Sequence, residues 1–292
     1  MILWGIVGLL RVSQGPALIY LDRPDRWSWR YGGFWPILRA MTPSRSLTFE
    51  VCVDTAMGAK TAEIAGAHRV ELCANLLEGG TTPSAGSVAW VQDNLTIGVM
   101  VLIRPRGGDF VYSSAEVEVM LRDIEAVKQA GVMGVVIGAL CPDGSLDLPV
   151  IRAMVEAAHP MQITFHRAFD MCSDPDAALA QLIELGVDRI LTSGRKDAAA
   201  DGLARLARQV EQAGDRISIM PGGGIFEHDI HRVVEESGAH EVHFAAAVTE
   251  ESPMQFRNPE CKMGCGSIPG EYDRVVTDEQ RIREYIRRGS GL

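Results

Sequence analysis

Two short stretches of the chain carry the same pair of reactive side chains. Glu50 and Cys52 lie in EVCVD, and Glu71 and Cys73 lie in RVELC, with the same spacing within each pair. Alternate residues of a β-strand face the same side, so each stretch would present a carboxylate and a thiol to one side. Carboxylates in such positions can serve as general acids or bases, whereas buried cysteines are often inert core residues. The pattern predicts two acids and two thiols on one side of neighbouring strands.

A third stretch, TFHRAFD, is an apolar run that ends in three charged or polar side chains. These are His166, Arg167 and Asp170. Their burial without partners would be costly, so they either form a structural network or face a ligand. We expect His166 to point inward at the strand end, Arg167 to turn toward the loops, and Asp170 to orient either of them. His166 and Asp170 therefore join the two glutamates as candidate acid–base groups.

These residues require strands to position them, and eight strand-like runs alternate with helical segments. The runs are residues 48–54, 68–73, 98–104, 133–139, 161–166, 187–193, 216–222 and 240–246. Helix-start signals follow three of the runs: Ser113 followed by Glu116, Asp174 followed by Pro175, and Thr277 before the last helix. Eight strand–helix pairs predict a (β/α)8 TIM barrel over residues 46–292. A doubly wound open sheet is the alternative, but the GxGxxG expected after its first strand is missing.

The charged residues on the predicted inner faces allow two interpretations. Arg104 and Arg106 follow the third strand and are expected to face inward with Glu50 and Glu71, while His243 lies in the eighth strand. The arginines either neutralise the glutamates in a charge-balanced core or help to bind a ligand. Buried ion pairs do not reliably add stability, so we favour binding and include His243 among the ligand-binding candidates.

Two glycine-rich loops indicate that the ligand is a small anion. RPRGGDF contains Arg104 and Arg106, and PGGGIF supplies Gly222, Gly223 and Gly224 after the seventh strand. Backbone N–H groups of glycine clusters converge on anions, and the loops after strands seven and eight commonly hold phosphate in TIM barrels. We therefore expect the two arginines and the three glycines to line an anion site.

Composition limits the classes of partner. The chain has 292 residues, of which 47% are hydrophobic, and its net charge of −10 argues against nucleic-acid binding. No apolar run approaches the ~18 residues needed to cross a bilayer, so no membrane partner is expected. The six cysteines lack the spacing of a disulfide framework, which favours a reducing, cytoplasmic setting.

Residues 1–45 differ from the rest of the chain. They hold four of the five tryptophans, and MILWGIVGLL has neither a basic start nor a clear cleavage site, so it is a poor secretory signal. One interpretation is an organelle-targeting extension. The interpretation we favour is an accessory or disordered tail, with Met41 as the natural start.

Several motifs in order resemble the CutC family, the copper homeostasis proteins. They are EVCVD, RVELCANLLEGGTTPS, IRPRGGDFVYS, TFHRAFDM, ILTSG, MPGGGI, EVHF and MQFRN, and they span Phe49 to Tyr272. The resemblance implies a TIM barrel that forms a homo-oligomer, either a homodimer or a homotetramer, and that handles copper in the cytoplasm.

The resemblance also implies a copper site. It identifies Cys52 and Cys73 as ligands of Cu(I), a soft ion that accepts two thiolates in near-linear geometry. Cys261 and Cys265 in CKMGC form a second soft pair that could bind copper opportunistically.

Two functions remain open from the sequence. The first is a CutC-type protein that binds Cu(I) for copper homeostasis. The second is an enzyme that acts on a small phosphorylated or carboxylated substrate, with Glu50, Glu71, His166 and Asp170 as its acid–base groups.

Overall fold

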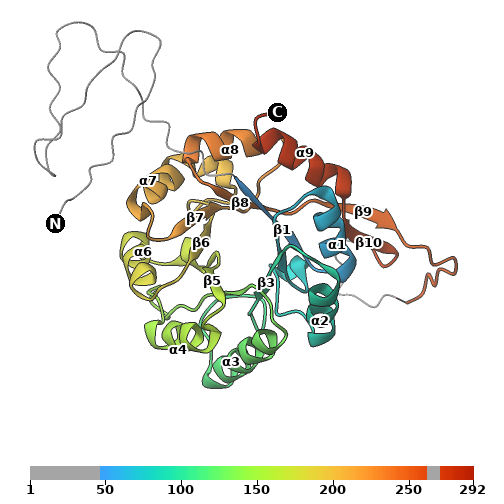
Figure 1. Ribbon diagram of the computed structural model, residues 1–292. Helices are drawn as coiled ribbons and strands as arrows, with labels where there is room; N and C mark the ends of the chain where they lie inside the picture. Colours follow the sequence, from blue (N-terminus) through green and yellow to red (C-terminus); the bar gives the residue numbers. More distant parts are fainter. Residues whose placement is uncertain (1–46, 262–269) are drawn as a thin grey trace, which may run out of the picture. The chain divides into compact units, whose positions relative to one another are not determined.

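The computed structural model describes residues 47–261 and 270–292 (Figure 1). The predicted extension of residues 1–45 lies outside the described residues, and so does Cys265.

Eight parallel strands form the barrel. They follow the order β7-β6-β5-β4-β3-β2-β1-β8, and β7 also contacts β8, so the sheet nearly closes on itself. The strands are β1 (Thr48–Val53), β2 (Arg69–Leu72), β3 (Gly98–Leu102), β4 (Gly134–Ile137), β5 (Gln162–Phe165), β6 (Arg189–Thr192), β7 (Ser218–Pro221) and β8 (Glu241–Phe244). Each lies within one of the predicted runs. The predicted TIM barrel is confirmed, and the doubly wound alternative is wrong.

Helices follow the strands and form an outer ring around them (Figure 1). They are α1 (Ala56–Ala65), α2 (Ala85–Asn94), α3 (Ser114–Gln129), α4 (Leu148–Ala158), the short α5 (Ala168–Met171), α6 (Pro175–Glu184), α7 (Leu203–Ala213), α8 (Ile230–Ser237) and α9 (Glu279–Gly289). Two 3₁₀ turns, η1 (Leu76–Glu78) and η2 (Ala199–Asp201), lie in the loops. The last helix, α9, packs against both α1 and α8, so the first and last helices of the barrel meet and close the ring.

The two faces of β1 show how the alternation divides the side chains. Phe49, Val51 and Val53 are buried in the apolar layer between strands and helices. Glu50 and Cys52 face the interior, as predicted, since Glu50 contacts Arg69 of β2 there and Cys52 contacts Cys73, directly after β2. Beside β3 and β4 the barrel interior is apolar, since Met100, Leu102 and Val136 pack together there.

Two of the three predicted helix starts are confirmed. Ser113 and Glu116 form a reciprocal capping box at α3, and Asp174 caps α6 with Pro175 in its first turn. The prediction of Thr277 as the cap of α9 is wrong, because Thr277 ends a strand and the Asp278 carboxylate accepts the Arg281 N–H at 2.7 Å instead.

An antiparallel pair outside the barrel was not predicted. Its strands, β9 (Ala247–Glu251) and β10 (Asp273–Thr277), project from the side of the barrel next to α1 (Figure 1). Within the ranges that the structure describes, no helix is both long and apolar enough to cross a membrane.

Candidate metal centre at the barrel mouth

Two thiols lie side by side near the C-terminal ends of the strands, here called the mouth of the barrel. Cys52 in β1 and Cys73 directly after β2 have sulfur atoms 3.8 Å apart. Parallel pairing of β1 with β2 places Cys52 opposite Glu71, and the Cys73 sulfur is 3.5 Å from Glu71 Oε2. One ligand atom from each of these three residues lies within 4.8 Å of the others. The strand alternation therefore brings the predicted thiols together as expected.

Below the thiols, a network of ion pairs neutralises the buried carboxylates. The guanidinium of Arg69 contacts both Glu50 and Glu241, with 2.5 Å between Arg69 Nη2 and Glu241 Oε2. Arg189 also pairs with Glu241, and His243 Nδ1 lies 2.8 Å from Glu50 Oε1. His243 was among the predicted residues, but the two arginines were not, although Arg69 stands two positions before Glu71 and so shares its face of β2.

The network fixes the charge of each group near the thiols. Burial disfavours the charged form of Glu50, but Arg69 and His243 outweigh it and lower the pKa of Glu50 to about 2. Burial also opposes the charge on His243, yet hydrogen bonds to Cys52 and Glu50 raise its pKa well above its usual value. Burial, together with the charge on Cys52, raises the pKa of Glu71 well above that of an ordinary carboxyl. At neutral pH, Glu50 is therefore a carboxylate, whereas the surroundings of Glu71 favour its uncharged form more than water does.

The two cysteines take opposite protonation states. The hydrogen bond from Cys73, which outweighs burial and is helped by His243, lowers the pKa of Cys52 to about 5. The same bond to Cys52, together with burial, raises the pKa of Cys73. Cys52 is consequently a thiolate at neutral pH, and Cys73 is the thiol that donates to it. A thiolate is the form of cysteine that binds metals and acts as a nucleophile.

A cavity of about 260 Å³ lies over the thiols. Its lining includes six of the polar residues at the mouth: Cys52, Glu71, Cys73, Arg104, His166 and His243. Of the predicted site residues, these are the ones that the fold gathers around one space. Glu50 lies below them, within hydrogen-bonding distance of His243.

Arg106 does not join this cluster, and the expectation that it faces inward is wrong. β3 ends at Leu102, so the alternation of an extended strand does not continue to residue 106. The Arg106 side chain is 38% exposed, with Nε 2.5 Å from Glu116 Oε1 and Nη2 3.2 Å from Asp109 Oδ1. Its charge is therefore neutralised on the surface.

The glycines after β7 lie at the mouth and allow close packing. A Cβ on Gly222 would stand 3.1 Å from the Cβ of His243, and one on Gly223 would stand 2.8 Å from the guanidinium carbon of Arg167. Gly223 also has a φ of +95°, which favours glycine. Gly223 and Gly224 line a second cavity of about 470 Å³ that shares Arg167 and His243 with the first.

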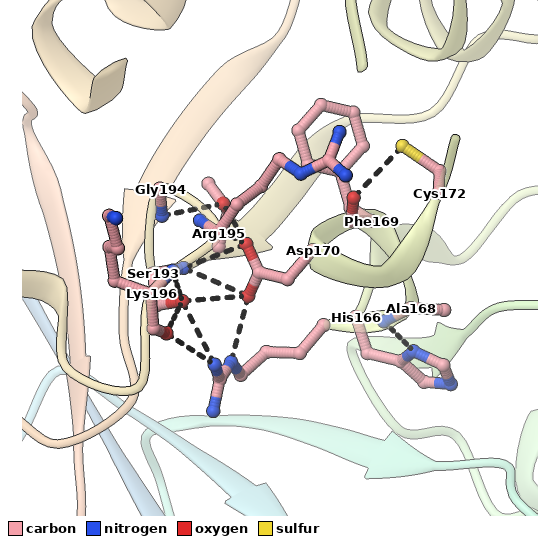
Figure 2. Close-up of polar contacts among 11 residues, drawn as sticks. His166, Ala168, Phe169, Asp170, Cys172, Ser193, Gly194, Arg195 and Lys196 are labelled. Atoms are coloured by element: carbon pink, nitrogen blue, oxygen red, sulfur yellow. Dashed lines mark hydrogen bonds and ion pairs between the residues drawn. The ribbon is translucent and has the colours of Figure 1, made fainter. Parts of the chain in front are cut away.

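Asp170 belongs to a structural network at the loop after β6 (Figure 2). Its Oδ1 accepts hydrogen bonds from the Thr192 hydroxyl at 2.6 Å and from the Arg195 N–H at 3.0 Å. Its Oδ2 accepts the N–H and hydroxyl of Ser193 and, at 2.9 Å, Nε of Arg167. Arg167 does turn toward the loop, as expected, and Asp170 orients it. The carboxylate is occupied by these donors and lies apart from the cavity lining.

Comparison with known proteins assigns the family. Residues 47–248 match the sequence model of the CutC family. The chain belongs to the CutC family. A copper homeostasis protein cutC homologue of Homo sapiens is 48% identical over 234 residues, which cover 80% of this chain and 86% of the human one. A family protein CutC of Parabacteroides distasonis is 47% identical over 238 residues, covering 81% of this chain and 98% of the bacterial one.

A solved structure agrees with this assignment. A CutC protein from Streptococcus agalactiae, described as a copper homeostasis protein, superposes with a TM-score of 0.66 at 33% sequence identity. The superposition covers 68% of this chain and 98% of that one. The CutC family and its barrel are therefore supported by both sequence and fold.

Proposed function

We propose that this CutC-family protein binds Cu(I) through Cys52 and Cys73 as part of copper homeostasis. One observation carries the proposal: two cysteine sulfurs lie 3.8 Å apart beneath a cavity, within a barrel whose interior holds them in place. Thiolates are the ligands that Cu(I) prefers. Since Cys52 is already ionised at neutral pH, metal binding at the two sulfurs would have to displace a proton from Cys73.

The distances favour three ligands over two. With metal–sulfur bonds of roughly 2.3 Å, a linear site would place the sulfurs about 4.6 Å apart. The observed 3.8 Å corresponds to a bent arrangement that leaves room for a third donor. Glu71 Oε2 supplies one, 3.5 Å from the Cys73 sulfur. We infer a three-coordinate site of two sulfurs and one oxygen in place of the near-linear one expected from the sequence.

Location and assembly complete the proposal. The five cysteines among the described residues are free, which suits a reducing compartment, and we propose a cytoplasmic location. The CutC family assignment is the basis for proposing a homodimer or homotetramer.

Two of the four candidate acid–base groups still support the hypothesis that the protein is an enzyme. Glu71 and His166 line the cavity, where a substrate could reach them. Glu50 is bound by Arg69 and His243, and Asp170 is bound by the β6 loop, so neither is free to exchange protons with a ligand. We therefore prefer the copper site as the primary function.

Competitive titration tests the copper site. The double variant Cys52→Ser/Cys73→Ser should lose at least ~100-fold in Cu(I) affinity, because loss of mere supporting residues at metal sites already costs 10–100-fold. Affinity would be measured anaerobically against a chromophoric Cu(I) chelator. The matched control, Cys261→Ser/Cys265→Ser, should bind like the wild type. The reverse pattern would place copper at the CKMGC segment and reject this proposal.

A further inference from the structure

We propose that the cavity above the thiols is a binding site for a small oxyanion, a carboxylate or a phosphate, held by Arg104 Nε and His166 Nε2. This inference goes beyond copper binding and does not depend on it. It rests on two buried nitrogen atoms, both without a hydrogen-bond partner, on residues that line one cavity.

Arg104 carries a buried positive charge, and no carboxylate among the described residues forms an ion pair with it. Its side chain donates to three backbone carbonyls: Nη1 to Glu78 at 3.0 Å and Gly80 at 2.8 Å, and Nη2 to Gly108 at 2.7 Å. These neutral partners fix the guanidinium in place but leave its charge uncompensated. The ring of Phe110 covers one face, 5.1 Å from the guanidinium carbon. A fixed cation of this kind is ready to accept an anion, because burial of an unpaired charge is otherwise costly.

Both Nη atoms of Arg104 donate to backbone carbonyls, which leaves Nε as the donor available for a ligand. It is buried and has no hydrogen-bond partner. Arg69 and Arg189, the other arginines inside the barrel, place their Nε atoms on carboxylates. Among the described residues, Arg104 makes no comparable ion pair, which distinguishes it from the arginines that balance the core.

His166, directly after β5, adds an uncharged hydrogen-bond donor to the cavity lining. Its Nδ1 accepts the Ala168 N–H at 3.1 Å, which leaves the proton of the neutral ring on Nε2. Figure 2 shows the imidazole turned away from the Asp170 network, with one hydrogen bond, accepted from the Ala168 N–H. Nε2 is buried and unpartnered. Burial and the charge of Arg104 lower the pKa of His166 to about 3, so the ring stays a neutral hydrogen-bond donor.

The chain makes room for this ring orientation. A Cβ on Gly138 would stand 2.4 Å from Cε1 of His166. Any larger residue at position 138 would therefore push the imidazole out of place. The glycine shows that the packing accommodates His166 in this pose.

The size and lining of the cavity limit the ligand. A volume of about 260 Å³ is small for a ligand pocket, since pockets for drug-sized molecules begin at about 300 Å³. Three aliphatic side chains also line it: Leu76, Leu102 and Leu191. The site therefore suits an anion with few carbon atoms, or inorganic phosphate.

Calorimetric titration of the copper-free protein tests the inference, with sodium acetate and sodium phosphate as separate probes at constant pH and ionic strength. We expect saturable binding of at least one probe, and the preferred probe distinguishes a carboxylate from a phosphate site. The melting temperature should rise with the logarithm of that probe's concentration. If neither probe binds the wild type in a saturable way, the inference is wrong.

Two variants and a matched control locate the binding. Arg104→Lys keeps a positive charge but lacks Nε–H, and His166→Phe keeps the ring shape but lacks Nε2–H. Each should weaken binding by about tenfold, as expected for loss of a hydrogen bond to a charged group. Arg106→Lys makes the same change on the surface and should leave the affinity unchanged. Equal affinities in all three variants would overturn the inference.

Different variants test copper binding and anion binding independently. Cys52→Ser/Cys73→Ser should still bind the anion, and Arg104→Lys should still bind Cu(I). Circular dichroism and thermal unfolding would verify that each variant is folded. If Arg104→Lys does not fold, His166→Phe decides the question alone.

Discussion

Replacing Arg69 with methionine should lower the free energy of unfolding by about 3–5 kcal/mol, the usual cost of removing one partner from a buried ion pair. The change leaves Glu50 without its main countercharge, while Glu241 keeps only Arg189. Glu50 is 1% exposed, so water cannot replace the lost guanidinium. Urea denaturation at neutral pH would measure the loss.

A surface ion pair provides the control for this prediction. Arg208→Met removes an exposed partner of Asp176 and should cost less than ~1 kcal/mol. Adding Glu50→Gln to Arg69→Met should recover part of the loss, since the stranded charge is then removed. If Arg69→Met costs no more than Arg208→Met, the buried network does not hold the barrel together.

The same network predicts a dependence on pH. The pKa of Glu50 in the folded protein, about 2, lies below the 4.5 of an ordinary glutamate. The stability from this group is therefore complete above pH 4.5 and is lost as the pH falls toward 2. The Arg69→Met variant should show a smaller loss over this range, because the pKa of Glu50 then moves back toward its usual value.

Asp170→Asn should also be strongly destabilising, by about 3 kcal/mol, because it weakens several hydrogen bonds and the charge that supports them. One carboxylate oxygen becomes an NH₂ donor that faces the donors of Ser193 or Arg195 (Figure 2). We expect faster hydrogen exchange at the amides of residues 193–196, besides the loss in urea denaturation.

The same substitution at an exposed aspartate serves as the control for Asp170→Asn. Asp143 accepts the N–H and hydroxyl of Ser145 in a surface turn, and Asp143→Asn should cost less than ~1 kcal/mol. An equal cost for the two variants, with unchanged exchange at residues 193–196, would mean that Asp170 does not organise this loop.

The strands of the barrel were predictable because their periodicity is simple. Alternation alone places Cys52 of β1 and Cys73, directly after β2, on the inner face, and the parallel pairing of the two strands then brings the sulfurs together. Arg104 follows the same rule although it lies two residues past β3. The rule fails at Arg106, where the chain has already turned away.

Other parts of the site depend on contacts that no local pattern encodes. Arg69 and Glu241 lie far apart in the sequence. They meet only because β1 pairs with β2 on one side and with β8 on the other. Asp170 lies in α5, a helix of a single turn directly after β5, which directs its carboxylate to the loop after β6. Sequence spacing could place Asp170 near His166 but could not show which of the two would face the cavity.

X-ray absorption spectroscopy of the protein loaded with one equivalent of Cu(I) tests the central claim most directly. The site described here predicts two sulfur ligands at about 2.3 Å and one oxygen or nitrogen ligand. Cys52→Ser/Cys73→Ser, loaded in the same way, should lose both sulfur ligands. Two sulfur ligands that persist in this variant, or a wild-type spectrum without sulfur, would contradict a copper site at Cys52 and Cys73.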